Sequence, residues 1–267
     1  MADLVLSSPA NARIKAVLSL RNRRVREQTG NTRLEGREEL ELALAAGVVP
    51  RSLYHCPELM ADRPGGLALV ERTRAVGAEI IACTPPVFAK AAYREGPDGF
   101  LAVAATPGVT LPALDVPRGS LLLVCQGIEK PGNLGAMLRT ADAAGVAAVI
   151  AADPVTDWGN PNVVRASKGT VFSLPVASAT TAEALSWLSE RGYAVVATTP
   201  EAGALHTESD LTGSVAVAVG TEKHGLDATL LGASTIRVRI PMAGRADSLN
   251  AATAAAIVLF EAVRQRG

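Results

Sequence analysis

Cysteine and aromatic residues are scarce in this 267-residue sequence, and its formal net charge is zero. The three cysteines (Cys56, Cys83 and Cys125) form no disulfide framework and no CxxC pair, so we interpret them as small buried hydrophobic residues. The four Phe, three Tyr and two Trp amount to 3% of the chain, which argues against a sheet that stacks successive nucleobases on aromatic rings. Lys and Arg total 26, as do Asp and Glu, so a uniformly basic surface is excluded, whereas a local basic patch is not.

Long apolar runs are also lacking. The longest unbroken apolar stretches, such as residues 121–125 and 146–152, have the length of a strand and fall far short of a membrane span. Arg13, Lys15 and Arg21 interrupt the first segment, which therefore lacks the apolar core of a signal peptide. Hydrophobic residues make up 48% of the chain and charged residues 19%, which allows a packed core and excludes wholesale disorder. We expect a soluble, cytoplasmic protein.

Several catalytic signatures are missing as well. The sequence has no Walker A loop, no GxGxxG after the first strand of either half, no GxSxG elbow, no HExxH and no deaminase motif. Its three histidines are scattered, so no histidine-ligated metal site is expected. These absences disfavour ATP hydrolysis, NAD chemistry through the usual fingerprint and zinc hydrolysis.

The alternation of elements predicts an α/β protein with two domains. A small α/β unit is expected over residues 1–105, followed by a Pro/Gly-rich linker at 106–118. Residues 119–267 are expected to form a mostly parallel sheet with helices on both faces. The expected strands are residues 48–55, 79–83, 100–105, 120–126, 147–151, 174–176, 193–198, 215–219 and 236–240. The expected helices are residues 34–46, 66–76, 86–92, 133–144, 161–168 and 181–191, with a last one from about 248 to the end.

Three loops that follow strands of the second half contain candidate site residues. Asn133 and Arg139 lie in the first, and the second holds Glu222 in a glycine-framed turn. The third, residues 240–250, runs into an alanine-rich helix. Ligands of open α/β sheets bind beyond the carboxyl ends of the strands, which favours a shared site. The alternative is structural: a capping asparagine, a solvated arginine, an exposed turn and a surface loop.

Taken together, the three loops resemble the motifs of the SpoU (TrmH) family of RNA ribose 2′-O-methyltransferases, which belongs to the SPOUT class. The resemblance covers residues 119–267 and includes a stretch from Arg165 to Pro175. Residues 33–40 resemble the opening of the family's RNA substrate-binding domain, while Lys130 stands where many relatives have an acid. The matching motif residues are Asn133, Gly135, Arg139, Thr140 and Ala141, then Gly220, Glu222 and Gly225, then Ile240, Pro241, Met242, Ser248, Leu249 and Asn250.

The resemblance implies a deep C-terminal trefoil knot, a homodimer with the active site at its interface, and S-adenosylmethionine as cofactor. Arg139 would anchor a phosphate and stabilise the forming alkoxide, because a guanidinium with a pKa above about 12 is a poor base. Asn133 and Glu222 would position Arg139 or the ribose, whereas Ser248 and Asn250 would hold the target phosphate and shape the knot loop. The residues implied to line the cofactor pocket are Thr198, Gly220, Ile240, Met242 and Leu249, with Thr198 placed only by its position at a strand end.

Residues 10–37 carry eight Lys and Arg against two acids, which favours an RNA contact over a merely solvated basic helix. The attached first domain favours 23S ribosomal RNA as substrate, with tRNA as the alternative within the same class. A non-catalytic RNA-binding protein is a further alternative, but it should lack Arg139 or the Ser-Leu-Asn motif, and both are present. The residues expected to contact RNA are Arg13, Lys15, Arg21, Arg23, Arg24, Arg26 and Arg37.

Overall fold

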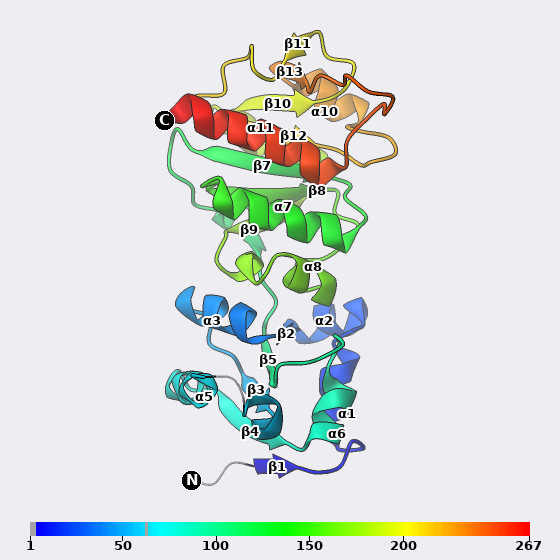
Figure 1. Cartoon of the computed structure of the whole chain (residues 1–267). Helices are drawn as coiled ribbons and strands as arrows, with labels where there is room; N and C mark the ends of the chain where they lie inside the picture. Colours follow the sequence, from blue (N-terminus) through cyan, green and yellow to red (C-terminus); the bar gives the residue numbers. More distant parts are fainter. Residues whose placement is uncertain (1–3, 62–63) are drawn as a thin grey trace. The chain divides into compact units, whose positions relative to one another are not determined.

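The computed structural model describes residues 4–61 and 64–267 and divides the chain into two compact units (Figure 1). The sequence prediction placed residues 158–173 in the second domain, but the structure groups this segment with the first unit. A division of the chain into two uninterrupted ranges cannot describe a segment that leaves the second unit and packs with the first. The first unit comprises Met1–Pro107 and Trp158–Ser173, and the second comprises Gly108–Asp157 and Leu174–Gly267.

The first unit is built on a five-stranded mixed sheet with the order β1-β4-β3-β5-β2. The β1–β4 and β3–β4 pairs are parallel, whereas β5 pairs antiparallel with both β3 and β2. The strands are β1 (Leu4–Leu6), β2 (Asn31–Glu35), β3 (Ser52–His55), β4 (Glu79–Cys83) and β5 (Phe100–Ala105). The helices are α1 (Ala12–Ser19), α2 (Arg23–Thr29), α3 (Arg37–Ala45), α4 (Pro57–Met60), α5 (Gly66–Ala75), α6 (Pro85–Ala91), α8 (Pro161–Ala166) and the 3-10 turn η2 (Thr170–Phe172).

The basic segment of the first unit forms two short helices and a strand. The Asn11 and Asn22 side chains accept hydrogen bonds from the backbone N–H groups of Arg13 and Arg24, which caps α1 and α2 separately. The helix expected from residue 34 was wrong at its start, because residues 34–35 complete β2 and α3 begins only at Arg37. Leu34 fits the apolar pattern of either element, and the pairing of β2 with β5 makes it part of the strand.

The second unit is built on an eight-stranded sheet in which every neighbouring pair is parallel. Its order is β11-β13-β10-β12-β7-β8-β9-β6, and all residues of β7, β8 and β12 are buried. The strands are β6 (Val109–Thr110), β7 (Leu121–Gln126), β8 (Ala148–Ala152), β9 (Val176–Ala179), β10 (Ala194–Thr198), β11 (Ala204–Leu205), β12 (Val215–Val219) and β13 (Ile236–Arg239). The helices are η1 (Leu111–Ala113), α7 (Pro131–Ala143), α9 (Thr181–Glu190), α10 (Ala228–Ala233) and α11 (Ala251–Arg266).

Helices cover both faces of this sheet, as the sequence predicted. The thiol of Cys125 on β7 lies 3.5 Å from the sulfur of Met137 on α7, whereas its neighbour Val124 packs in a cluster with Trp187 of α9. Figure 1 shows α7 and α11 side by side on the first of these faces, and α11 packs against α7 and β12. Leu111 and Leu114, from the second half of the expected linker, are buried in the cluster on the α9 face.

The strand order places the carboxyl ends of β13, β10, β12 and β7 next to one another. The loops that leave these strands therefore meet at one edge of the sheet, although they are far apart in the sequence. In the described part of the chain, no helix is long and apolar enough to cross a membrane.

Candidate functional site

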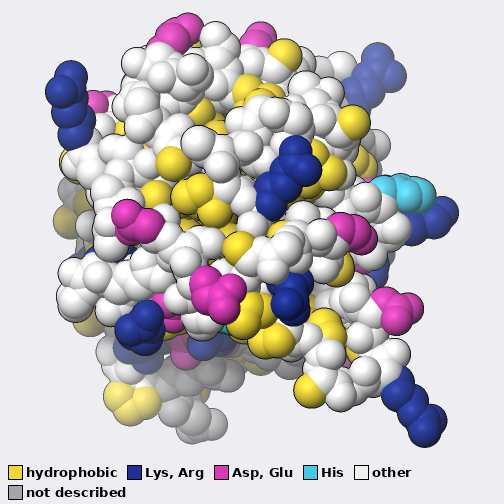
Figure 2. Space-filling model, turned by 90° about the horizontal axis from the view of Figure 1, so that it is seen from above, with side chains coloured by type: hydrophobic (Ala, Val, Ile, Leu, Met, Phe, Trp, Pro, Cys, Tyr) yellow, Lys and Arg dark blue, Asp and Glu magenta, His cyan; other side chains and the backbone are white. Residues whose placement is uncertain are grey.

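A cavity of about 560 Å³ lies at the carboxyl ends of β10, β12 and β13. Its volume is in the range typical of small-molecule sites, about 300–1,000 Å³. Figure 2 views the second unit from the β11 and β13 side, where hydrophobic side chains gather and charged side chains stand singly among them. The structure brings together in the wall of this cavity all five residues expected to bind the cofactor: Thr198, Gly220, Ile240, Met242 and Leu249.

The loop after β12 brings two backbone segments into close contact. A Cβ atom at Gly220 would lie 2.1 Å from the carbonyl carbon of Gly225, so no side chain fits at this position. Thr221 and Gly225 exchange two backbone hydrogen bonds of 3.0 Å, which close the loop. At Gly220 the loop therefore presents backbone to the cavity, as close approach to a ligand requires.

Thr198, the last residue of β10, contributes an unpaired polar atom. Its hydroxyl oxygen is buried and has no hydrogen-bond partner among the residues that the structure describes. Because a buried hydroxyl without a partner is unfavourable, a polar ligand atom in the cavity would satisfy it. Ile240 and Leu249 line the same cavity and supply apolar wall. The site thus offers both apolar surface and a hydroxyl group that lacks a hydrogen-bond partner in the described chain.

A chain of hydrogen bonds joins the three motif loops. The Asn133 side-chain amide donates to the Glu222 carboxylate, and the Asn250 amide donates to the Asn133 oxygen at 3.2 Å. Asn250 also caps α11, because its side-chain oxygen accepts from the backbone N–H of Ala252 at 2.9 Å. The ammonium of Lys130 lies 4.0 Å from the Glu222 carboxylate. Residues 117 positions apart are held in one polar network.

The remaining predicted catalytic residues, Ser248 and Arg139, lie in different settings. Ser248 lines the cavity, as does Glu222. Arg139 is exposed on α7, and its side chain has no hydrogen bond or ion pair within the described ranges. Asn133 and Glu222 contact each other and leave Arg139 untouched, so the expectation that they position Arg139 finds no contact here. Its guanidinium is available to another molecule.

Sequence reasoning missed several polar residues of the cavity wall. Glu201 lies three residues beyond β10, and a hydrogen bond from the Thr199 hydroxyl lowers the pKa of its carboxyl group. Arg237 on β13 also lines the cavity and donates to the Leu231 carbonyl at 2.6 Å. No motif includes either residue. The signal that could have found them was their position, since Glu201 lies just beyond β10 and Arg237 lies within β13.

The basic residues expected to contact RNA are largely occupied within the first unit. Arg26 is only 2% exposed and donates to the carbonyls of Leu20 and Arg21 at 2.9 Å, so it supports a turn rather than facing solvent. Lys15 and Arg24 are exposed, and their side chains make no hydrogen bond or ion pair with residues in the described ranges. Four others bind acceptors of their own unit: Arg13 with Glu79, Arg21 with the Ala92 carbonyl, Arg23 with Glu27 and Arg37 with Glu41.

Comparisons with known proteins match both units. A model of the SpoU rRNA Methylase family matches residues 120–260, and a model of the MRM3-like substrate binding domain matches residues 11–102. The chain is 33% identical over 266 residues to a 23S rRNA (uridine(2479)-2'-O)-methyltransferase of Streptomyces viridochromogenes, covering 96% of this chain and 91% of that protein. It is 29% identical over 255 residues to the Bacillus subtilis 23S rRNA (guanosine(2553)-2'-O)-methyltransferase RlmP, covering 96% and 97% of the two chains.

Solved structures agree with this similarity. The AdoMet-bound rRNA methyltransferase from Sinorhizobium meliloti is 30% identical, with a TM-score of 0.88 over 97% of each chain. The SpoU methyltransferase AviRb from Streptomyces viridochromogenes, in complex with the cofactor AdoMet, is 31% identical, with a TM-score of 0.85 over 96% of this chain and 98% of that one. The similarity therefore extends over nearly the whole chain.

Proposed function

The chain belongs to the SpoU rRNA methylase family, and we propose that it transfers a methyl group from S-adenosylmethionine to a ribose 2′-hydroxyl of 23S ribosomal RNA. The observation that carries this proposal is the meeting of the three motif loops, through Asn133, Glu222 and Asn250, beside a cavity with the unpaired Thr198 hydroxyl. Full-length relatives named as 23S rRNA methyltransferases support ribosomal RNA over the tRNA alternative.

The cavity fits S-adenosylmethionine. Ile240 and Leu249 provide apolar surface for an adenine, Thr198 offers a hydroxyl that lacks a partner, and Gly220 allows backbone to approach the ligand closely. Met242 completes the set of residues that would hold the cofactor. When bound, S-adenosylmethionine supplies a methyl group activated by the positive charge of its sulfonium.

The protein's task is then to orient the ribose and to stabilise charge. Correct orientation of two reactants can supply about 7–11 kcal/mol of the barrier. We assign Arg139 to anchoring a phosphate and stabilising the forming alkoxide, because a guanidinium stays protonated and remains free of internal partners in the described chain. Ser248 would hold the target phosphate from the cavity wall, while Asn133 and Glu222 would position the ribose.

Three further features belong to the same proposal. The segment between β13 and α11 would form a trefoil knot, and two copies of the chain would dimerise so that Arg139 serves the partner's cofactor. The exposed position of Arg139 supports this arrangement. The first unit, including residues 158–173, would bind the RNA substrate, and residues 119–267 without that segment would form the methyltransferase domain. A cytoplasmic location is proposed with them.

Transfer of a labelled methyl group from S-adenosylmethionine tests the function. Unmodified 23S rRNA and bulk tRNA are assayed in parallel, and the products are digested with alkali, because a 2′-O-methyl group blocks cleavage at the next phosphate. We expect label in alkali-resistant dinucleotides from 23S rRNA. Label in tRNA alone would move the substrate to the alternative class. Absence of cofactor binding in calorimetry would overturn the enzyme assignment.

A further inference from the structure

Three arginine side chains surround one exposed tyrosine in the first unit. The guanidinium carbons of Arg21, Arg33 and Arg165 lie 5.4, 5.9 and 6.0 Å from the centre of the Tyr93 ring. Tyr93 is 41% exposed, and Arg21 and Arg165 are exposed as well. An aromatic ring attracts cations to its face, so it can hold like charges together that would otherwise repel. The cluster therefore concentrates positive charge at one place on the surface.

Arg33 forms the floor of this cluster and is incompletely paired. It is 1% exposed, and a single nitrogen, Nη2, donates both to Glu35 at 2.9 Å and to the Ala91 carbonyl at 2.7 Å. Its Nε and Nη1 atoms have no hydrogen-bond partner within the described ranges. Burial lowers the pKa of Arg33, and the charge of Arg21 lowers it further. A nearby anion would favour the charged guanidinium and so raise the pKa of Arg33 again.

A small cavity of about 10 Å³ opens beside these groups. That volume accommodates about one water-sized atom, such as a single oxygen. Residues of both chain segments of the unit line it. They are Arg33, Glu35, Tyr93, Arg94, Pro161, Val164 and Arg165.

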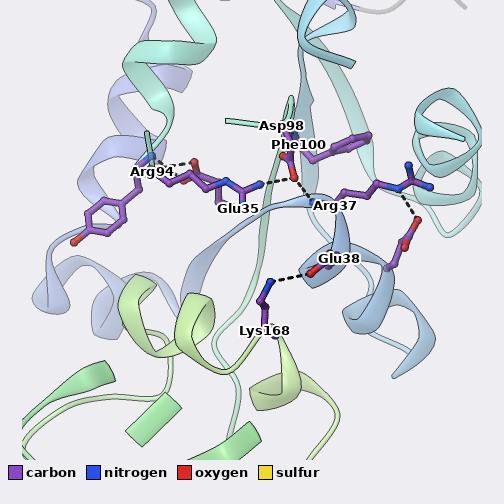
Figure 3. A network of polar contacts seen from close by, with 9 residues as sticks. Glu35, Arg37, Glu38, Arg94, Asp98, Phe100 and Lys168 are labelled. Atoms are coloured by element: carbon purple, nitrogen blue, oxygen red, sulfur yellow. Dashed lines mark hydrogen bonds and ion pairs between the residues drawn. The ribbon is translucent and has the colours of Figure 1, made fainter. Parts of the chain in front are cut away.

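The acidic side chains of the neighbourhood are already occupied (Figure 3). Glu35 accepts from the backbone N–H groups of Tyr93 at 2.7 Å and Arg94 at 3.3 Å, besides its ion pair with Arg33. Asp98 pairs with Arg94 and accepts from the backbone N–H of Arg37 at 2.8 Å. Arg94 is therefore neutralised by Asp98 and Arg33 by Glu35, which leaves the charges of Arg21 and Arg165 without an acidic partner in the described chain.

Arg165 is held in place by the packing of its own segment. The Asn162 amide donates to the Tyr93 hydroxyl at 3.2 Å, and the Thr32 hydroxyl donates to the Gly159 carbonyl at 2.5 Å. Figure 3 also shows the Lys168–Glu38 ion pair, 2.9 Å long, farther along the same segment. A site whose groups are fixed before binding loses less entropy when the ligand arrives.

We propose that Arg21, Arg33 and Arg165 around Tyr93 bind one phosphodiester group of the RNA substrate. One non-bridging oxygen enters the small cavity toward the unpaired nitrogens of Arg33, and the other faces Arg21 and Arg165. Guanidinium groups are the preferred protein partners of phosphate oxygens, and such contacts position a nucleic acid without reading its sequence. The inference rests on the proposed RNA substrate and adds to it a specific site that uses Tyr93, Arg33 and Arg165, none of which was among the residues expected from the sequence to contact RNA.

Binding of the full-length protein to an unmodified 23S rRNA transcript tests the site. We expect Arg165→Gln to weaken binding about tenfold, as loss of a charge-assisted contact would. The slope of log affinity against log salt should become shallower by about 0.7–0.9, the value for one lost phosphate contact. Arg72→Gln is the matched control, since Arg72 is an exposed arginine of α5 in the same unit and lies outside the cluster. It should leave affinity and slope close to those of the unsubstituted protein.

A double variant tests whether one phosphate is shared. If Arg21 and Arg165 serve the same group, the combined Arg21→Gln and Arg165→Gln variant should lose less affinity than the sum of the single losses in free energy. Inorganic phosphate is added as a competitor, because free phosphate presents the same oxygens. Competition that disappears in Arg165→Gln supports the site. Urea denaturation checks that each variant is folded, because the substituted residues lie in the first unit.

The outcomes separate this inference from the function on which it rests. If the unsubstituted protein binds and methylates the transcript while Arg165→Gln behaves as Arg72→Gln does, the phosphodiester site is wrong and the function stands. If the unsubstituted protein neither binds nor methylates the transcript, the proposed function fails and the site fails with it. Strict additivity in the double variant would also contradict a shared phosphate.

Discussion

In the second unit, the side chains assigned to the cofactor gather round one cavity, whereas in the first unit the basic side chains assigned to RNA lie on separate elements. The cavity forms because parallel strands end at a common edge, so their loops must meet. The basic side chains of residues 10–37 are not brought together in this way. Arg26 turns inward to cap carbonyls, and Arg13 binds Glu79.

The difference shows what a local pattern can and cannot specify. A glycine or hydroxyl at the end of a parallel strand has its position set by the sheet, as for Gly220 and Thr198. A long arginine side chain reaches whatever acceptor is nearest, so a run of positive charge predicts a surface only on average. The buried Arg33 and the distant Arg165 become neighbours only in the folded chain, where both lie beside Tyr93.

The largest effect is expected at Arg139. Arg139→Ala should reduce methyl transfer by about 10²–10³-fold or more, the range for removal of a group that stabilises transition-state charge, with cofactor affinity nearly unchanged. Single-turnover methyl transfer and calorimetry measure the two quantities. Arg118→Ala, which removes another exposed arginine of the second unit, serves as the control and should retain activity. Activity that survives Arg139→Ala would contradict the role assigned to Arg139.

The close packing beside the cavity gives the next effect. Gly220→Ala places a methyl group 2.1 Å from the Gly225 backbone, so the loop must shift. We expect a loss of about 1–3 kcal/mol of stability from overpacking, together with more than a tenfold loss of cofactor affinity. Urea denaturation and calorimetry measure both. Gly232→Ala is the matched control, because Gly232 lies in α10 and a Cβ atom added there would have nothing within 4 Å. Equal affinities in the two variants would contradict a tight backbone approach at Gly220.

Two neighbouring arginines of the first unit should respond in opposite ways. Arg26→Met removes a buried donor from the Leu20 and Arg21 carbonyls and should cost about 1–3 kcal/mol of stability. Arg24→Met, at an exposed position, should change stability by less than about 0.5 kcal/mol but weaken binding to 23S rRNA. Urea denaturation and salt-dependent RNA binding distinguish them. If Arg26→Met lost RNA affinity and kept its stability, the inward role of Arg26 would be wrong.

The smallest effect concerns a carboxylate of the second unit. Hydrogen bonds from Arg264 and then Gln265 lower the pKa of Glu261 on α11 from its usual value of 4.5 to about 2. A lowered folded-state pKa stabilises the protein above pH 4.5, and this contribution is lost as the pH falls toward 2. Glu261→Gln should therefore have a lower Tm than the unsubstituted protein at neutral pH, with the gap closing in acid. A gap independent of pH would exclude ionisation of Glu261 as its cause.

The sequence alone predicted much of the second unit and less of the first. The buried β12 and its glycine-framed loop were identified because continuous apolar runs and turn glycines are local signals. The strand β2 was missed, since its pairing with β5 lies far along the chain. The sequence also placed Trp158–Ser173 in the second domain, whereas the structure groups it with the first unit, because its helix pattern is local and its packing with the first unit is not.

What the sequence determined by itself was the α/β alternation and the three motif loops, whereas the five residues implied to bind the cofactor came from the resemblance to the SpoU family. The alternation follows from strand and helix periodicity, which acts over a few residues. Tertiary structure decided that Asn133, Glu222 and Asn250 form one network and that Arg139 stays outside it. It also decided which arginines turn inward and which surround Tyr93, because a guanidinium binds the acceptors and rings that the folded chain brings within its reach.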